Sequence, residues 1–182
     1  MKRAIIVPAA LSGAPLAELK AWLGIRLSEE DQALTTLLRA SLETCEAFTG
    51  QMPLEAECEE ILPQASTWMW LATRPVQAIS AVDGIAADGT RTPVEAENYE
   101  IELDADGGAC VRAAIYPAAN RIAVRFTAGI APGWASLPEG LKHGVLRLAA
   151  HNYRQRDREA ALTTPPAAVT ALWQPWRRMR LA

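Results

Sequence analysis

The stretch from Phe126 to Asp157 constrains the fold more than any other part of the chain, because a strand, a loop and a long helix are expected within it. Its helical part repeats apolar residues at the spacing of a single helical face: Leu141, Val145, Leu148 and Ala149. Pro138 lies in the expected first turn, where a backbone N–H has no intrahelical partner in any case. From Asn152 onward the helix becomes basic and polar. We therefore expect one part of this helix to lie in a core and the other to face solvent.

Two further helices are expected near the N-terminus, over residues 15–24 and 28–50. The first has a proline in its first turn and a glycine at its end, as helices commonly do. The second begins with the S-x-x-[DE] pattern of a helix start at Ser28, and an apolar stripe at helical spacing follows. Residues 1–13, ahead of both helices, are expected to form an extended arm.

Between these helical segments the spacing of apolar residues changes to that of strands. Residues 56–128 contain about six short runs of strand-type residues, one of which alternates Trp68 and Trp70 with apolar neighbours. Turn signals separate the runs, namely Asp83-Gly84, Asp88-Gly89 and Asp104–Gly108. The expected fold is α+β: a helical bundle from the N-terminal helices and a long C-terminal helix over 137–160, an inserted antiparallel β subdomain of about six short strands, and a C-terminal tail.

The tail, residues 163–182, follows a domain expected to span residues 1–162. It begins with Thr163-Thr164-Pro165-Pro166, which cannot continue a helix. It then gathers residue types that dominate interface hot spots: Trp173, Trp176, Arg177, Arg178, Met179 and Arg180. Three interpretations stay open. The tail docks on a neighbouring protein, its tryptophans fold back on the protein's own core, or its arginines bind nucleic acid.

Charge is unevenly distributed along the chain. The net charge is −3, but eight basic and three acidic residues lie from Leu137 to the end, against ten basic and eighteen acidic residues before it. This polarity suits a protein that stacks between charged neighbours, or one whose basic end meets an acidic surface. Ordinary scatter of charge is the alternative.

No pattern of catalytic, metal-binding or cofactor-binding residues is evident. His143 and His151 lie eight residues apart, roughly 12 Å along a helix, too far to share a metal directly. Glu139 and His143 would supply only two ligands. The aspartates of the Asp104–Gly108 loop fit a hairpin turn, because the later ligands of a calcium loop are missing. We therefore expect neither metal nor cofactor, and no enzyme.

Three widely spaced cysteines, without a CxxC pair, favour a reducing compartment over a disulfide framework: Cys45, Cys58 and Cys110. No run of about 18 apolar residues predicts a membrane span. Lys2-Arg3 followed by four apolar residues is faintly similar to a signal peptide, but Pro8 interrupts the run, so secretion is not expected.

Several segments of the sequence, taken in order, match the pattern of one known family. They are Pro15–Ile25, Glu29–Asp31, Glu46–Gly50, Arg74–Val82, Tyr99–Leu103, Val124–Gly129, Leu137–Lys142 and Ala149–Arg154. Their order and spacing resemble the head–tail connector (adaptor) proteins of HK97-like long-tailed phages and of the related gene transfer agents. The resemblance covers about Pro15 to Asp157, and the tail lies outside the pattern.

The resemblance implies a structural role without enzymatic activity. Subunits of this family form a ring, typically dodecameric, between the portal protein and the tail-completion or stopper protein, and the ring continues the DNA channel. It implies a place at the head–tail junction of a virion or phage-like particle, after synthesis in the bacterial cytoplasm. DNA would pass through without sequence-specific binding, and the isolated protein would be able to stay monomeric until it assembles in the particle.

By the same resemblance, the tail residues named above would contact the portal. The basic residues of the long helix would serve subunit or portal contacts, with a solvated face as the alternative: Arg147, Arg154, Arg156 and Arg158. Two other classes of function stay open, a DNA-binding packaging component of the same kind of particle and an unrecognised enzyme. The sequence does not distinguish a phage, a prophage and a gene transfer agent.

Overall fold

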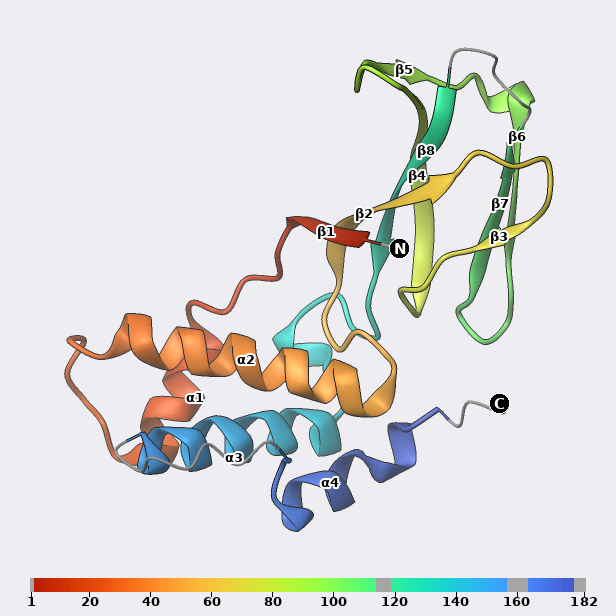
Figure 1. Ribbon diagram of the computed structural model, residues 1–182. Coiled ribbons are helices and arrows are strands. Elements are labelled where there is room, and N and C mark those ends of the chain that lie inside the picture. The colour runs from red at the N-terminus through yellow and green to blue at the C-terminus, as the bar shows by residue number, and fades with distance from the viewer. Residues whose placement is uncertain (1, 114–118, 157–163, 179–182) are drawn as a thin grey trace. The chain divides into compact units, whose positions relative to one another are not determined.

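The computed structural model describes residues 2–113, 119–156 and 164–178. The chain folds into two compact units (Figure 1). The β unit consists of residues 1–8 and 55–129, and the helical unit consists of residues 9–54 and 130–182. The chain therefore begins in the β unit, builds the first part of the helical unit, returns, and then completes the helical unit.

In its described residues, the β unit forms two antiparallel sheets. The larger sheet has the strand order β1-β2-β8-β4-β5 and the smaller one the order β3-β7-β6. The strands of the larger sheet are β1 (Lys2–Val7), β2 (Ala56–Pro63), β8 (Ala119–Ala128), β4 (Val76–Ala86) and β5 (Arg91–Pro93). The smaller sheet is built from β3 (Met69–Trp70), β7 (Ala109–Ala113) and β6 (Tyr99–Leu103), with a 3₁₀ turn η1 (Ala96–Asn98) before β6.

The described residues of the helical unit form four helices: α1 (Ala14–Leu23), α2 (Asp31–Thr49), α3 (Glu139–Gln155) and α4 (Ala167–Trp173). Two 3₁₀ turns flank the last two, η2 (Trp134–Ser136) before α3 and η3 (Gln174–Trp176) after α4. The antiparallel sheets and the helices together confirm a mixed α and β class with antiparallel pairing.

The core of the β unit lies along the paired strands β2 and β8. Cys58 lies directly opposite Phe126, and both side chains are fully buried. Ile122, Val124 and Phe126, at every second position of β8, lie on one face of the sheet and are all buried. Apolar residues of this spacing therefore define the central strand, and β2 and β4 pair on its two sides.

Two expectations about the strands are wrong. The strand beginning at Val76 does not end at Asp83-Gly84 but runs on to Ala86, and the chain turns instead at Gly89, whose φ is 89°. Arg125 Nη2 donates to the Asp83 carboxylate at 2.8 Å, so a turn-type residue is held inside the sheet. Residues 2–7 are extended as expected, but the expectation that they form an arm is wrong, because they are the strand β1, which pairs with β2.

The hairpin expected at Asp104–Gly108 is confirmed. The Asp104 N–H donates to the carbonyl of Gly108 at 2.9 Å, and the Gly108 N–H donates to the Asp104 carboxylate at 2.6 Å. Gly107 has a φ of 74°, in the left-handed region where glycine carries no steric cost. This loop therefore uses its aspartate and its glycines to close a turn, and it joins β6 to β7.

The helices begin and end close to the expected positions. The second helix starts at Asp31 rather than at residue 28, and no side chain caps it. The long helix starts at Glu139, with Pro138 just before it, and is described as far as Gln155. Apolar side chains of these helices form one core, which includes Leu34 and Leu38 of α2 and Leu141 and Val145 of α3. The apolar stripes read from the sequence are thus the buried faces.

A buried carboxylate, that of Glu60, organises the loop that leads into β4. Glu60 is fully buried on β2 and accepts three hydrogen bonds. The donors are the Ala72 N–H at 2.9 Å, the Thr73 N–H at 2.9 Å and the Thr73 hydroxyl at 2.6 Å. A buried carboxylate is tolerated only when its oxygens are paired in this way.

A neighbouring carboxylate, that of Glu59, binds two arginines from other strands. Arg91 of β5 donates to both Glu59 oxygens, at 2.6 and 2.8 Å, and Arg125 of β8 lies 3.6 Å away. The hydrogen bonds from Arg91 hold the pKa of Glu59 below its ordinary value, although burial alone would raise it. The charge of this carboxylate therefore ties the short strand β5 to the middle of the sheet.

We predict that Glu59→Gln reduces the dependence of stability on pH. Because the pKa of Glu59 is lower in the folded than in the unfolded chain, this group stabilises the fold above its unfolded pKa. That contribution is lost as the pH falls through the folded value. The free energy of unfolding, measured in urea at a series of acidic pH values, is therefore expected to change less steeply with pH for Glu59→Gln than for the wild type. An unchanged slope would contradict the prediction.

Candidate interaction surfaces

The expected tail is part of the helical unit as far as the structure describes it. Helix α4 packs against α3 and α2. Trp173, at its end, is fully buried, and its indole Nε1 donates to the Leu141 carbonyl at 3.4 Å. Its ring also lies against Phe48 of α2, with 6.0 Å between the ring centroids. Of the alternatives for Trp173, the structure has the one in which the side chain folds back on the protein's own core.

Gly144 of α3 provides the space for Trp173. A Cβ atom added to Gly144 would lie 2.1 Å from the indole nitrogen of Trp173, far inside any real contact distance. A glycine in the middle of a helix costs about 1 kcal/mol relative to alanine, so its presence in α3 calls for a packing reason. The close approach of Trp173 supplies that reason.

The residues after Trp173 continue along the end of α2. Gln51 Nε2 donates to the Trp176 carbonyl at 2.7 Å, and the Arg178 N–H donates to the Thr49 carbonyl at 3.0 Å. The guanidinium of Arg177 lies over the Phe48 ring, 5.3 Å from its centroid. Residues 167–178 are therefore packed on the helical unit by these contacts.

The tail residues expected to bind the portal thus divide into three kinds. Trp173 is buried, so its side chain offers no contact surface in this conformation. Trp176 and Arg178 are half-buried, and Arg177 is exposed. Met179 and Arg180 lie outside the described residues.

The basic residues of α3 are not equivalent either. Arg147 and Arg154 are exposed. Arg156 Nη1 donates to the Glu30 carboxylate at 2.8 Å, and its guanidinium lies 4.5 Å from the centre of the Tyr153 ring. Arg158 lies outside the described residues. Arg156 is exposed as well, but its guanidinium is already bonded to Glu30, so Arg147 and Arg154 are the better candidates for contacts with another protein.

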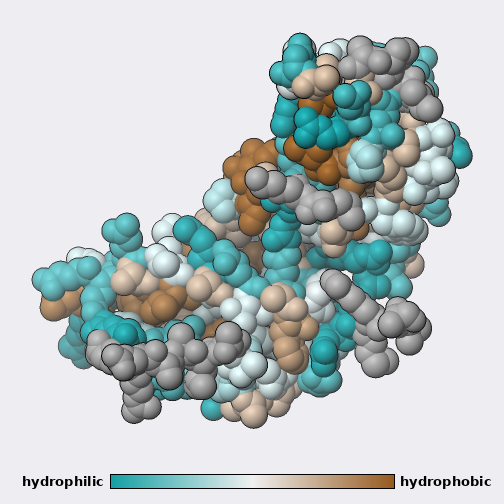
Figure 2. Space-filling view, viewed as in Figure 1, coloured by the Kyte–Doolittle hydropathy of each residue, from teal (hydrophilic) through white to brown (hydrophobic). Residues whose placement is uncertain are grey.

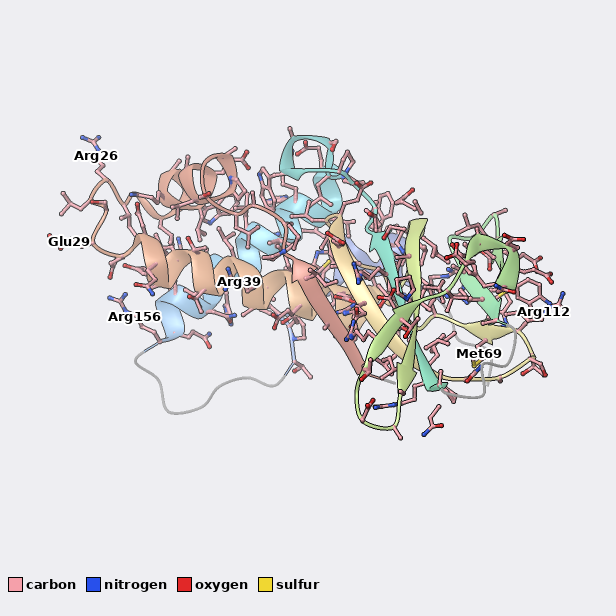
Figure 3. All side chains as sticks on the ribbon, turned by 90° about the horizontal axis from the view of Figure 1, so that it is seen from above. Arg26, Glu29, Arg39, Met69, Arg112 and Arg156 are labelled. Carbon is pink, nitrogen blue, oxygen red and sulfur yellow. The ribbon has the colours of Figure 1, made fainter. Side chains whose placement is uncertain are left out.

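Glu30, Tyr153 and Arg156 join the start of α2 to the end of α3 (Figure 3, where Arg156 is labelled). The Tyr153 hydroxyl donates to Glu30 at 2.5 Å. This bond and that from Arg156 lower the pKa of Glu30, and the carboxylate in turn raises the pKa of Tyr153. The cluster fixes the basic end of α3 to a neighbouring helix, which the helical pattern alone did not indicate.

The β unit carries exposed apolar side chains that sequence reasoning missed. They lie on three strands or beside them: Ile5, Ile6, Val7, Trp68, Trp70, Ile101 and Leu103. Figure 2 shows a hydrophobic patch over β1. The two tryptophans are partly covered, because Arg112 lies 4.9 Å from the Trp68 ring and Arg74 lies 5.5 Å from the Trp70 ring. The apolar residues of β1 and β6 are the larger uncovered feature.

Potential metal ligands do not come together in the described residues. No group of three or more histidine, cysteine, aspartate or glutamate side chains within residues 2–113, 119–156 and 164–178 could hold a metal ion. All three cysteines are buried and none forms a disulfide, and burial raises the pKa of the Cys45 thiol to about 12, which makes it a poor nucleophile. Among the described residues, none of the helices combines the length and the apolar character that a membrane span requires.

Comparisons with known proteins point to one kind of particle. No protein-family model matches the chain, and neither does any curated protein. Among solved structures, it is similar to a chain in the neck of an empty gene transfer agent (GTA) particle computed with C6 symmetry, with a TM-score of 0.78 and 26% identity. It is also similar to a chain in the neck of a native GTA particle computed with C12 symmetry (0.78, 27%) and to one in the virion of a native GTA particle (0.77, 28%).

These similarities extend over the whole molecule. In each case the alignment covers 100% of this chain and 98% of the other chain. The chain therefore shares its fold, including both units, with a structural component of the neck of gene transfer agent particles.

We predict that Gly144→Ala destabilises the protein. Overpacking of a tight site typically costs about 1–3 kcal/mol, and the higher helix propensity of alanine returns at most about 1 kcal/mol. Gly140→Ala is the matched control in the same helix, because its added Cβ would come no closer than 3.4 Å to the Leu172 carbonyl. Urea unfolding should show lower stability for Gly144→Ala and unchanged or slightly higher stability for Gly140→Ala. Equal stability of the two variants would contradict the packing described for Trp173.

Proposed function

We propose that this protein is a head–tail connector, or adaptor, of a gene transfer agent or a related phage particle. The observation that carries the proposal is the shared fold over the whole chain with components of gene transfer agent necks. Partial similarity would leave room for a common domain reused in another context. Coverage of both units by chains from this one kind of particle favours the same structural role, without enzymatic activity.

In this role the protein forms a ring between the portal protein and a tail-completion or stopper protein, at the head–tail junction. The similar chains come from necks computed with sixfold and twelvefold symmetry, which supports a ring that is expected to be dodecameric. Identical subunits in such a ring continue the channel through which DNA passes, and no sequence-specific DNA contact is required. The subunit is made in the bacterial cytoplasm before assembly.

The portal-facing surface is proposed to be the C-terminal segment. Trp176 and Arg178 are half-buried there and Arg177 is exposed, and Met179 and Arg180 follow in the sequence. Trp173 was expected to contact the portal, but it is buried against α3. Its proposed role is to fix the position of this segment on the helical unit. On α3, Arg147 and Arg154 are proposed to contact a neighbouring subunit or the portal.

Removal of residues 167–182 is a poor test of portal binding, because it would also remove Trp173 and Val169 from the core. Substitution of exposed side chains separates binding from folding. Arg177→Glu changes an exposed residue of the proposed surface, and Arg26→Glu makes the same change at an exposed position between α1 and α2.

We predict that the wild-type protein co-sediments with the portal of its own particle and that Arg177→Glu binds about tenfold more weakly, which corresponds to about 1.4 kcal/mol. Arg26→Glu should bind like the wild type. Portal binding that Arg177→Glu leaves unchanged would contradict the assignment of the C-terminal segment. Failure of the wild type to bind the portal, together with salt-dependent binding to duplex DNA, would favour a DNA-binding packaging component instead.

A further inference from the structure

The two sheets of the β unit have four edge strands among the described residues, and two of these are protected against pairing with another chain. Strand β5 has three residues and ends at Pro93, which has no N–H to donate, and β3 has only two residues. Short strands and prolines are the usual means by which proteins prevent the pairing of exposed edges. Strands β1 and β6 have six and five residues and contain no proline. These two edges therefore lack the protection that the other two have.

The edge formed by β1 is apolar as well as long. Ile5, Ile6 and Val7 have exposed fractions of 44%, 45% and 54%. Among the described strands β1 pairs only with β2, so its other side presents backbone donors and acceptors. An apolar edge strand of this kind is a template for pairing with another chain.

The edge formed by β6 has matching properties. Ile101 and Leu103 have exposed fractions of 38% and 49%, and among the described strands β6 pairs only with β7. By sequence, β1 (KRAIIV) is basic and β6 (YEIEL) is acidic, although Arg3 of β1 also donates to the Thr73 hydroxyl at 3.5 Å. Glu100 already forms an ion pair with Arg112, at 2.5 Å. Glu102 is therefore the carboxylate of β6 that we expect to contact a basic group of another chain.

The two edges lie on opposite sides of the β unit. In Figure 1, β1 is at one side of the unit and the smaller sheet with β6 is at the other, and the view in Figure 3 agrees. A ring of identical subunits needs two different and complementary patches, since each copy contacts one neighbour with the first patch and the other neighbour with the second. A pair of matching edges at opposite sides meets that requirement.

We infer that β1 of one copy pairs with β6 of the next copy around the ring. The pairing joins the five-stranded sheet of one subunit to the three-stranded sheet of its neighbour, and it covers the apolar side chains of both strands. Main-chain hydrogen bonds provide affinity and the alternate side chains provide specificity, as in other cases of strand addition. This inference rests on the proposed function, because it names the contact between subunits of the proposed ring.

The test is disulfide cross-linking in the ring assembled on the portal. Ile6→Cys is combined in one chain with Ile101→Cys, Glu102→Cys or Leu103→Cys, so that both faces of β6 and neighbouring registers are sampled. The native cysteines are buried, so the wild type under the same oxidation is the background control. At least one double variant is expected to give a ladder of covalent multimers up to the size of the ring. A mixture of the corresponding single variants should stop at dimers, because each chain then holds only one half of the contact.

A second measurement does not depend on the register of the strands. Ile6→Lys places a charge in the apolar edge and is expected to weaken ring assembly about tenfold, whereas Thr92→Lys, on the protected edge β5, should have no effect. A ring that forms normally with Ile6→Lys and gives no cross-link in any double variant would overturn the inference and leave the proposed function standing. A wild type that forms no ring on the portal would overturn both.

Discussion

The close packing of Trp173 against Gly144 is the contact on which the helical unit depends. It places a large aromatic side chain from the end of the chain between α2 and α3, and it is possible only because α3 lacks a Cβ at that position. The same contact determines where the C-terminal residues lie, since the Trp176 carbonyl then accepts from the side-chain amide of Gln51 and the Arg178 N–H donates to the Thr49 carbonyl. A core interaction and the position of the proposed portal-binding surface are therefore one feature.

Local patterns predicted the elements whose partners are local or periodic. The helical stripes gave α2 and α3, and the Asp104–Gly108 turn gave the β6–β7 hairpin, because these features follow from neighbouring residues. The continuation of β4 through Asp83 was missed, because its cause is Arg125, 42 residues away. The burial of Trp173 was left open for the same reason, although a glycine inside the α3 pattern was the one available signal.

The sequence predicted what type of surface the protein would present, but only some of the residues that form it. Composition indicated an interaction protein, and it located basic and aromatic residues at the C-terminal end. It did not show that Arg156 is bonded to Glu30, or that β1 and β6 present apolar edges, because exposure depends on which strands pair and which remain at the edge of a sheet. The tertiary structure thus shortens the list of expected contact residues, and it adds the edges β1 and β6 of the β unit as a second candidate surface.

The central claim is that the protein forms a ring on a portal, and electron microscopy of the wild-type protein mixed with the portal of its own particle tests it most directly. Our account predicts portal assemblies with an added ring of this protein, coaxial with the portal and open at its centre. Portals that stay bare in the presence of excess protein, with the protein remaining as separate single copies, would contradict it.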